Sequence, residues 1–470
     1  MKILFINPPT NVSMVKEGRC MQRKGAWTAV WAPITLATSA ALLRDSGFDV
    51  RIIDCSVEVL TLEEVCDICR QYKPDLVIIN TATPSIESDL NFAAVVKDLN
   101  LGEIKVAAIG IHVSVLAEEC LKMQSRLDFV VRGEAEFTLK ELAEALRSKG
   151  EISKVKGVSY HYGDKITHNP DADFPDDLDS LPFPAWDLID INKYRLPFKD
   201  KPFLLVSTGK GCPYNCIFCC TKPYYGSKLR LRSPARVVDE IEWAGDKFNV
   251  KDFLFWTESF TLNKEYAISI CNEIISRGLS VDWVCNSRVD AVSPDLLKTL
   301  KKAGCWMIGY GIESGDQAIL DMAKKNTTLK QIEQAIRWTK DVGIEVTAHT
   351  IFGLPGETRL SIDKTMKFLK KMDVDFAQIY CAVPFPGSSL FDLAKRNNWI
   401  LNKDWMFFEQ NFSVLDIGSI NADAVMSLRK KALIGFYFRP RPIFKTIRRI
   451  RSFKDLKVFL NMLREFISWI

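Results

Sequence analysis

The chain has 470 residues, 47% of them hydrophobic and 26% charged, which is enough for two or three globular domains with substantial cores. Because it contains no apolar run of about 18 residues and no signal-peptide pattern, we expect neither a membrane-spanning nor a secreted protein. The net charge is only +5, and thirteen cysteines without disulfide-framework spacing predict a reducing, cytoplasmic location.

Residues 1–150 alternate short β-rich runs with stretches of helical apolar spacing. The predicted strands are Lys2–Asn7, Val50–Asp54, Leu76–Asn80 and Lys105–Ile109, and the predicted helices are Pro33–Ser46, Thr61–Tyr72 and Ser88–Asp98. This alternation indicates an α/β fold with a doubly wound, Rossmann-like parallel sheet. Such sheets bind ligands at the carboxyl ends of their strands.

The residues at those strand ends are small or polar, as the approach of a broad, flat ligand to the backbone requires. They are Asn7, Pro8, Pro9, Asp54, Thr81, Thr83, Gly110 and His112. No G-x-G-x-x-G follows the first strand, which argues against a dinucleotide. The alternative is a structural Rossmann-like unit or one that binds a nucleotide.

Residues 151–200 are predicted to link two domains. Gly157–His168 alternates apolar and polar residues around Gly163 and Asp164, which indicates a hairpin. The acidic, proline-rich stretch from Asn169 to Pro184 then predicts an ordered strap.

Residues 201–390 contain six strand-like runs separated by helical patterns. The runs are Phe203–Ser207, Phe253–Trp256, Val281–Asn286, Trp306–Gly311, Glu345–Ile351 and Phe376–Val383. This series predicts a partial (β/α)6 barrel with its reactive residues at the carboxyl ends of the strands.

Three cysteines follow the first of these runs. Cys212, Cys216 and Cys219 have the spacing C-x3-C-x2-C, which suits three corners of a 4Fe–4S cluster and leaves the fourth iron open to another ligand. The alternatives are a zinc knuckle and a disulfide loop. Zinc sites usually contain paired C-x2-C units or a histidine, and disulfides do not suit a reducing compartment.

With Phe218 before its last cysteine, this loop resembles the cluster loop of the radical S-adenosylmethionine (SAM) superfamily. The resemblance implies that the methionine end of SAM chelates the open iron and that an electron cleaves SAM to a 5′-deoxyadenosyl radical. Cys212, Cys216 and Cys219 are then both the metal ligands and the catalytic residues.

Strand-end motifs that resemble the same family imply the SAM-binding residues. Glu258, in a stretch like F-x-D-D-x-F-T, would hold the methionine amine, although Thr257 replaces the usual first acid. Arg288 would reach a carboxylate, and an ion pair with Asp290 is the alternative. The alternative for Glu258 is a solvated loop acid.

Two further turns resemble motifs of this family. Gly309–Gly315 matches G-x-E-S-G, in which Glu313 and Ser314 would lie at the ribose. Phe352–Thr358 matches G-L-P-G-E-T, in which Gly353 and Pro355 would pack beside the adenine. Each turn alone fits ordinary Gly/Pro loop chemistry, but several in order at strand ends strengthen the resemblance.

The first domain resembles the cobalamin-binding domain that precedes many radical SAM cores. Asn7–Pro9, Gly110 with His112, and Asp128–Glu134 carry the resemblance, which places Gly133 and Glu134 with the strand-end residues above as cobalamin-binding residues. The D-x-H-x-x-G motif that supplies a histidine ligand to cobalt is absent. We therefore expect His112 to pack or cap rather than to bind cobalt.

Residues 391–470 form a basic extension. Twelve Lys/Arg face one acid, Asp455, between Arg429 and Arg464, and Ile443–Ile470 has apolar residues at helical spacing. This pattern predicts a C-terminal helix that either packs on the barrel or lies on an anionic membrane. No nucleic-acid-binding motif accompanies the charge, so a nucleic-acid partner is not expected.

The resemblance covers nearly the whole chain and implies a cobalamin-dependent radical SAM enzyme with three cofactors: a 4Fe–4S cluster, SAM and cobalamin. Methyl transfer from methylcobalamin to an unactivated carbon is the leading hypothesis. Cyclase-like ring formation or rearrangement, on a lipid or tetrapyrrole, is the second. A cobalamin-sensing module without turnover is the third, and the intact SAM motifs argue against it. Expected partners are a small-molecule substrate, lipid or prenyl-derived if the tail binds membrane, and a reductant such as flavodoxin or ferredoxin.

Overall fold

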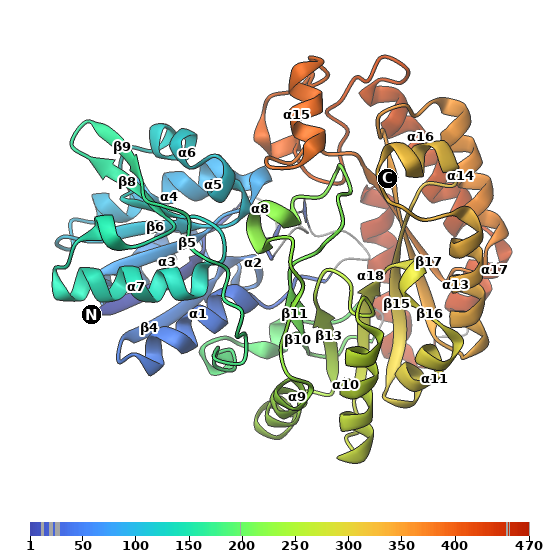
Figure 1. The fold of residues 1–470 in the computed structure, drawn as a ribbon, viewed down its shortest axis with the longest axis horizontal. Helices are drawn as coiled ribbons and strands as arrows, with labels where there is room; N and C mark the ends of the chain where they lie inside the picture. The colour runs from blue at the N-terminus through green and yellow to red at the C-terminus, as the bar shows by residue number, and fades with distance from the viewer. Residues whose placement is uncertain are drawn as a thin grey trace.

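The computed structural model describes residues 1–10, 14–17, 22–23, 29–197, 199–447, 450 and 452–469. Two sheets with their helices lie side by side, the first at the left of Figure 1 and the second at the right. The α/β fold class predicted from the sequence is confirmed.

The first sheet has seven strands in the order β4-β1-β5-β6-β7-β8-β9, and its first five strands are parallel. The strands are β1 (Lys2–Asn7), β4 (Asp49–Asp54), β5 (Leu76–Asn80), β6 (Lys105–Ile109), β7 (Phe129–Val131), β8 (Val158–Tyr162) and β9 (Lys165–His168). Its helices are α1 (Ile34–Asp45), α2 (Cys55–Glu58), α3 (Leu62–Tyr72), α4 (Ile86–Asp98), α5 (Ile111–Val115), α6 (Ala117–Met123) and α7 (Ala135–Ser148). The short pair β2 (Met14–Val15) and β3 (Gln22–Arg23) lies outside the sheet.

Alternate residues of the strands point to opposite faces of this sheet, and both faces are covered. Ile3 and Phe5 of β1 belong to one core with α1 and α7, whereas Leu4 and Ile6 belong to another with α3 and α4. Strands buried on both sides are the pattern of a doubly wound sheet, as the apolar runs predicted.

The predicted hairpin is present, but it extends the first sheet instead of crossing freely between domains. β8 pairs antiparallel with β7, and β9 pairs with β8. The strap that follows is ordered and lies against α1, where Ala185 N donates to Ala37 O at 2.9 Å.

The second sheet has six parallel strands that pair in chain order. They are β10 (Phe203–Ser207), β13 (Asp252–Trp256), β14 (Asp282–Ser287), β15 (Cys305–Glu313), β16 (Glu345–Phe352) and β17 (Phe376–Cys381), each within a few residues of its predicted range. The accompanying helices are α8 (Thr221–Tyr225), α9 (Pro234–Phe248), α10 (Lys264–Ser276), α11 (Pro294–Lys302), α12 (Gln317–Met322), α13 (Leu329–Asp341), α14 (Arg359–Lys371) and α15 (Ser389–Arg396).

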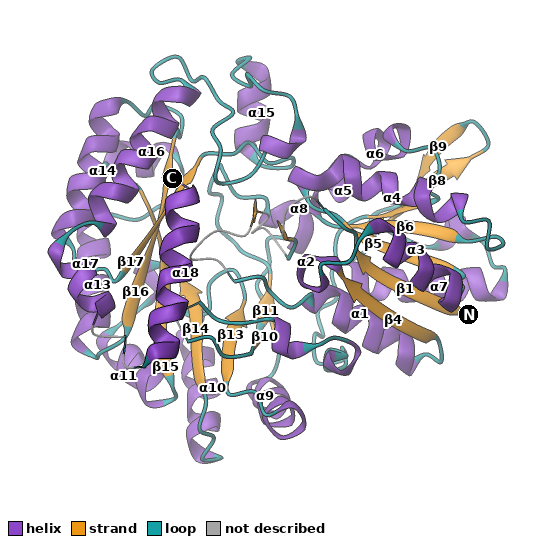
Figure 2. Ribbon diagram, turned by 180° about the vertical axis from the view of Figure 1, so that it is seen from behind, coloured by secondary structure: helices purple, strands orange, loops and turns teal. Residues whose placement is uncertain are grey.

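The C-terminal region contains three helices, α16 (Ala422–Tyr437), α17 (Pro440–Ile447) and α18 (Phe453–Trp469). α16 is anchored to the edge strand β17, because Arg429 Nε donates to Ile379 O at 2.7 Å and Tyr437 Oη donates to Ala377 O at 2.9 Å. In Figure 2, α18 lies in front of the second sheet. Within the described ranges, every helix is too short or too polar to cross a bilayer.

Candidate active site

The three motif cysteines lie on a loop that is closed at its base by a short β-ribbon. β11 (Gly209–Lys210) pairs antiparallel with β12 (Arg230–Leu231), and residues 211–229 form the loop between them. Gly211 enters the loop with φ of +91°, and a Cβ there would collide with the carbonyl oxygen of Lys228. A side chain at this position is therefore excluded both by conformation and by space.

Cys212, Cys216 and Cys219 line one cavity of about 200 Å³ at the carboxyl edge of the second sheet. All three are half-buried, reduced thiols. The turn that spaces them is held by a hydrogen bond from Cys219 N to Cys216 O of 3.1 Å, and Ile217 N donates to Ala323 O at 3.1 Å. The loop is thus fixed by its own backbone and by the helix that follows β15.

The chemistry of this donor set fits a 4Fe–4S cluster. Burial raises the pKa of Cys216, and the nearby Lys325 ammonium opposes that rise. Among the described residues, no three His, Cys, Asp or Glu side chains converge on a single metal ion. A four-iron cluster makes a different demand, because each thiolate binds its own iron.

Two glycines of β15, Gly309 and Gly311, line the cavity with the thiols. An added Cβ at Gly309 would lie 2.5 Å from Asn286 Oδ1 and 2.7 Å from His349 Nε2, and one at Gly311 would lie 2.5 Å from Glu313 Oε1. Glycine at these positions therefore lets the polar side chains of neighbouring residues pack directly against the β15 backbone.

The predicted SAM residues divide into two groups in the structure. Phe218, Glu258, Arg288 and Glu313 line the cavity together with the cysteines. Ser314, Gly353 and Pro355 do not line it in the part of the chain that the structure describes. Ser314 Oγ instead lies 3.2 Å from Thr365 Oγ1. Contacts of all seven residues with SAM stay predictions.

Arg288 makes the ion pair that the sequence offered as an alternative. Its Nε and Nη2 each donate to the Asp290 carboxylate at 2.9 Å, and Nη2 also donates to Lys325 O at 2.7 Å. The guanidinium lies 3.6 Å from the ring centroid of Tyr214, on the cysteine loop. Arg288 therefore holds the cysteine loop in place, and most of its N–H donors are engaged by groups of the protein.

Glu313 forms a buried ion pair that the sequence did not predict. Lys325 Nζ donates to Glu313 Oε1 at 2.7 Å, and both side chains are less than 10% exposed. Glu313 has φ of +64°, a strained conformation for a residue with a side chain. The strain coincides with the register shift between β15 and β16, which turns the carboxylate into the cavity.

Glu357 supports the glycine-rich turn after β16. Its Oε2 accepts hydrogen bonds from Gly353 N at 2.6 Å and from Leu354 N at 3.3 Å. Burial raises the pKa of Glu357 to about 8, because the backbone donors do not compensate for the loss of water. The turn is thus shaped by a carboxyl group that carries its proton at neutral pH.

At the carboxyl edge of the first sheet, two of the predicted cobalamin residues, Asn7 and Asp54, belong to a buried polar network with Asn80 and Tyr194. Asn7 Nδ2 donates to Asp54 Oδ1 and Asn80 Nδ2 donates to Asn7 Oδ1, both at 2.9 Å. Tyr194 Oη, from the segment between the strap and β10, donates to Asp54 Oδ2 at 2.7 Å. Pro8 is buried beside this network and Pro9 is half-buried.

His112 packs in the way the sequence predicted. It is 1% exposed, its Nδ1 lies 3.3 Å from Thr83 Oγ1, and its ring meets the edge of Trp405 at a centroid distance of 4.7 Å. Burial lowers the pKa of His112 to about 3, so the ring is neutral. Nearby, Thr81 Oγ1 donates to Ile109 O at 2.8 Å, and Gly110 has φ of +126°.

Other parts of the chain cover this first edge. Lys16 and Asp89 form a buried ion pair of 2.5 Å, and Asp89 also accepts from Ala82 N. Trp405 covers the other end through its contact with His112. The small and polar residues here fit a cobalamin chemically, but the covering residues must move before a ligand of that size can contact them.

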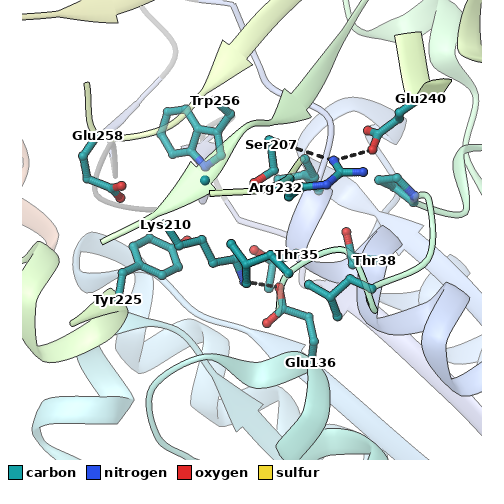
Figure 3. A pocket seen from close by; sticks show the side chains of 15 residues that line it. Thr35, Thr38, Glu136, Ser207, Lys210, Tyr225, Arg232, Glu240, Trp256 and Glu258 are labelled. Carbon is teal, nitrogen blue, oxygen red and sulfur yellow. Dashed lines mark hydrogen bonds and ion pairs between the residues drawn. The ribbon is translucent and has the colours of Figure 1, made fainter. Parts of the chain in front are cut away.

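A second cavity of about 40 Å³ lies between the two domains (Figure 3). Thr35 and Thr38 of α1 and Glu136 of α7 line one side of it. Arg232, on the other side, donates to Ser207 O at 2.9 Å and to Glu240 Oε2 at 2.6 Å. Glu258 lines both cavities, so it lies at the boundary between the thiol site and the first domain.

Sequence reasoning missed several residues of these sites. Lys325, His349, Tyr380 and Gln410 line the thiol cavity, yet none belongs to a recognisable motif. His349 lies on the predicted strand β16, and its place on that strand was the one signal available for it.

Comparison with known proteins agrees with this geometry. The radical SAM superfamily model matches residues 206–369, and the B12 binding domain model matches residues 26–143. An uncharacterized methyltransferase of Pyrococcus horikoshii is 33% identical over 99% of this chain and 98% of its own length. The anaerobic magnesium-protoporphyrin IX monomethyl ester cyclase of Rubrivivax gelatinosus is 31% identical over 83% of this chain and 69% of the cyclase.

Among solved structures, the radical SAM methyltransferase TsrM of Kitasatospora setae, with cobalamin and a 4Fe–4S cluster bound, has a TM-score of 0.69 at 17% identity. The match covers 94% of this chain and 86% of that one. The two matched domains define a class of enzyme that combines SAM cleavage at an iron–sulfur cluster with a cobalamin-binding domain. The chain belongs to this family, the cobalamin-binding radical SAM enzymes. The predicted family and its three cofactors are thereby confirmed.

Proposed function

We propose that this enzyme transfers a methyl group to an unactivated carbon of a small-molecule substrate. The observation that carries the proposal is the convergence of Cys212, Cys216 and Cys219 on one cavity, in a chain that also contains the cobalamin-binding domain. A relative matched over 98% of its length is named an uncharacterized methyltransferase, whereas the cyclase is matched over 69% of its length.

When bound, the cluster with SAM supplies a carbon radical and cobalamin supplies the methyl group. In our proposal the three thiolates hold the cluster, and Gly309 and Gly311 let the adenosyl group approach β15. Glu258, at the boundary of the two cavities, accepts hydrogen bonds from the methionine amine.

We assign the other predicted residues by where they lie. Phe218 and Glu313 contact SAM in the cavity, and Arg288 positions the loop through Tyr214 and Asp290. Ser314, Gly353 and Pro355 shape the turns behind the cavity. On the first domain, we assign to cobalamin the edge residues Asn7, Pro8, Pro9, Asp54, Thr81, Thr83, Gly110, His112 and Gly133.

Methyl-labelled SAM distinguishes methylation from the cyclase-like alternative. We expect the reduced enzyme, loaded with cobalamin, to form labelled methylcobalamin before any substrate is added. A matched preparation of Cys216→Ala controls for label that arrives without the cluster site. If 5′-deoxyadenosine accumulates but methylcobalamin does not, the enzyme is a non-methylating one and cyclase-like chemistry replaces our proposal.

α18 supports a second part of the proposal, that the enzyme works at an anionic membrane surface on a lipid or prenyl-derived substrate. Its inner side is packed, since Phe466 is 1% exposed and contacts Tyr437. Its outer side carries apolar residues at helical spacing: Phe453 (83% exposed), Leu456, Leu460 (52%) and Ile467 (61%). A helix that only packs on the barrel would turn polar residues outward.

Flotation with phosphatidylglycerol vesicles tests this contact. Deleting the C-terminal region would not test this contact cleanly. A deletion from residue 426 onward would remove most of α16, whose Arg429 and Leu433 are buried. Full-length point variants are therefore needed. We expect Leu456→Gln/Leu460→Gln to lower vesicle binding about tenfold or more. Leu360→Gln, at another exposed apolar position, is the control. Equal flotation of wild type and the double variant contradicts the membrane role.

A further inference from the structure

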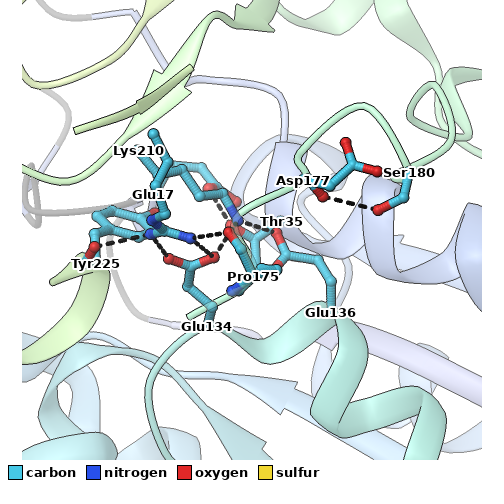
Figure 4. Close-up of polar contacts among 10 residues, drawn as sticks. Glu17, Thr35, Glu134, Glu136, Pro175, Asp177, Ser180, Lys210 and Tyr225 are labelled. Atoms are coloured by element: carbon cyan, nitrogen blue, oxygen red, sulfur yellow. Dashed lines mark hydrogen bonds and ion pairs between the residues drawn. The ribbon is translucent and has the colours of Figure 1, made fainter. Parts of the chain in front are cut away.

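The base of the cysteine loop contacts the first domain through two cations. In the β11–β12 ribbon, Lys210 and Arg230 are direct partners, so they mark the two ends of the loop that holds the cysteines. Lys210 points toward Glu134 and Glu136 at the start of α7 (Figure 4). Arg230 forms an ion pair with the same Glu134 carboxylate. One carboxylate of the first domain therefore contacts both ends of the loop.

The contacts are buried and strongly directional. Arg230 donates to both oxygens of Glu134, through Nη2 to Oε1 and through Nη1 to Oε2 at 3.2 Å. Lys210 Nζ lies 3.4 Å from Glu134 Oε2 and 2.7 Å from Glu136 Oε1. The side chains of Arg230 and Glu134 are 2% and 5% exposed. A bidentate guanidinium–carboxylate pair out of water fixes both distance and orientation.

Other interactions also hold Arg230 and Lys210 in place. Arg230 also donates to Pro175 O at 2.9 Å and to Tyr225 O at 2.8 Å, so its position depends on the strap and on α8. Burial disfavours the charge of Lys210, yet Glu136 and Glu134 raise its pKa overall.

We infer that Glu134 is an interdomain positioning residue that clamps the cysteine loop to the cobalamin-binding domain, and that it does not bind cobalamin. Its position supports this role, because Gly133 has φ of +73° and turns the chain from β7 into α7. The clamp sets where the iron ligands lie relative to the first sheet. This inference rests on the cluster proposed above, so its test includes one measurement that needs no turnover.

The test measures iron release from the reconstituted, full-length enzyme to a chelator, alongside binding of hydroxocobalamin. We expect Glu134→Gln to speed iron release at least about tenfold, because the buried Arg230 loses its counter-charge while Lys210 keeps that of Glu136. The dissociation constant for hydroxocobalamin should change less than about twofold. Glu141→Gln, an exposed acid on the same helix α7, is the matched control and should change neither.

A second variant keeps the inference testable if Glu134→Gln does not fold. Arg230→Lys keeps the charge but loses the two-pronged contact, so it should release iron at an intermediate rate. Glu134→Gln/Arg230→Lys should add little to Glu134→Gln alone, because both changes break one contact. Loss of hydroxocobalamin binding with wild-type iron release overturns the inference and makes Glu134 a cobalamin residue. If the wild type binds no cluster, the proposed function itself fails.

Discussion

The carboxyl edges of the two sheets use their polar residues in opposite ways. At the first edge, Asn7, Asp54 and Asn80 hydrogen-bond one another and are covered. At the second, thiols and glycines line a cavity of about 200 Å³. Both edges lie at the carboxyl ends of parallel strands, where sheets of this kind bind ligands. The difference shows that whether a sheet edge offers an open cavity depends on which other segments of the chain cover that edge.

The largest effect is expected from mutations of the cysteines at the carboxyl edge of the second sheet, the open edge. Replacing Cys212, Cys216 or Cys219 with alanine removes one iron ligand, so bound iron after anaerobic reconstitution should fall at least about tenfold. Iron analysis and the absorbance of the cluster measure this. Cys220→Ala is the control, since Cys220 is the adjacent thiol and is buried. Equal iron loss in Cys220→Ala would contradict the three-ligand assignment.

Mutations at the covered carboxyl edge of the first sheet, the closed edge, should lower the stability of the fold. Asp54→Ala leaves Asn7 Nδ2 and Tyr194 Oη without their acceptor in a buried site, which should lower the free energy of unfolding by about 3 kcal/mol. Tyr194→Phe removes only one donor and should cost about 1 kcal/mol. Urea denaturation measures both. Asp67→Ala, at an exposed ion pair, should change stability by less than about 0.5 kcal/mol; a similar loss there would mean that burial of the network is unimportant.

A smaller effect is expected when the open edge is filled. Gly309→Ala places a methyl group 2.5 Å from Asn286 Oδ1 and 2.7 Å from His349 Nε2. We expect SAM affinity to fall about tenfold, because neighbouring atoms must shift into the cavity. Calorimetry with the reconstituted enzyme measures it. Gly245→Ala, where the nearest atom is 3.6 Å from the new Cβ, should bind SAM like the wild type. Unchanged affinity in Gly309→Ala would place the adenosyl group elsewhere.

The last expected effect concerns the pH dependence of stability and is spread over several pH units. The pKa of Glu357 is raised from 4.5 to about 8 by burial, so the native state holds this proton more tightly than the unfolded state. The stability this gives is complete below about pH 4.5 and is lost as the pH rises to about 8. Glu357→Gln should therefore flatten the decline of unfolding free energy by up to about 1.4 kcal/mol per pH unit.

Urea unfolding at several pH values between about 5 and 8 checks this prediction. Glu265→Gln, on the exposed side of α10, is the control and should keep the wild-type slope. A wild-type slope in Glu357→Gln as well would mean that Glu357 is ionised in the folded protein.

Local patterns predicted much of this molecule. The strands Lys2–Asn7, Leu76–Asn80 and Lys105–Ile109 match their predicted ranges, because buried apolar runs end at turn residues. The cysteine spacing predicted the thiol site for a similar reason, since its chemistry lies within one short stretch. The sequence offered the Arg288–Asp290 ion pair as one of two alternatives for Arg288. It could do so because the two residues are only two positions apart, so the contact is local.

Contacts between distant residues could not be predicted. The pairing of β8 with β7, Tyr194 with Asp54 and Glu134 with Arg230 depends on how the domains pack, and no local period encodes it. Glu134 shows the consequence. The motif around it predicted a cobalamin residue, but it carried no sign of the two cations of the other domain that contact its carboxylate.

The hairpin that extends the first sheet also affects how this protein can associate with other chains. Without β8 and β9, the sheet would end at the buried strand β7, whose unpaired backbone could recruit a strand from a neighbouring molecule. The hairpin replaces that edge with β9, which is four residues long and has exposed side chains at Lys165 and His168. Short, polar edge strands discourage intermolecular pairing, so the hairpin protects the sheet against aggregation at this end.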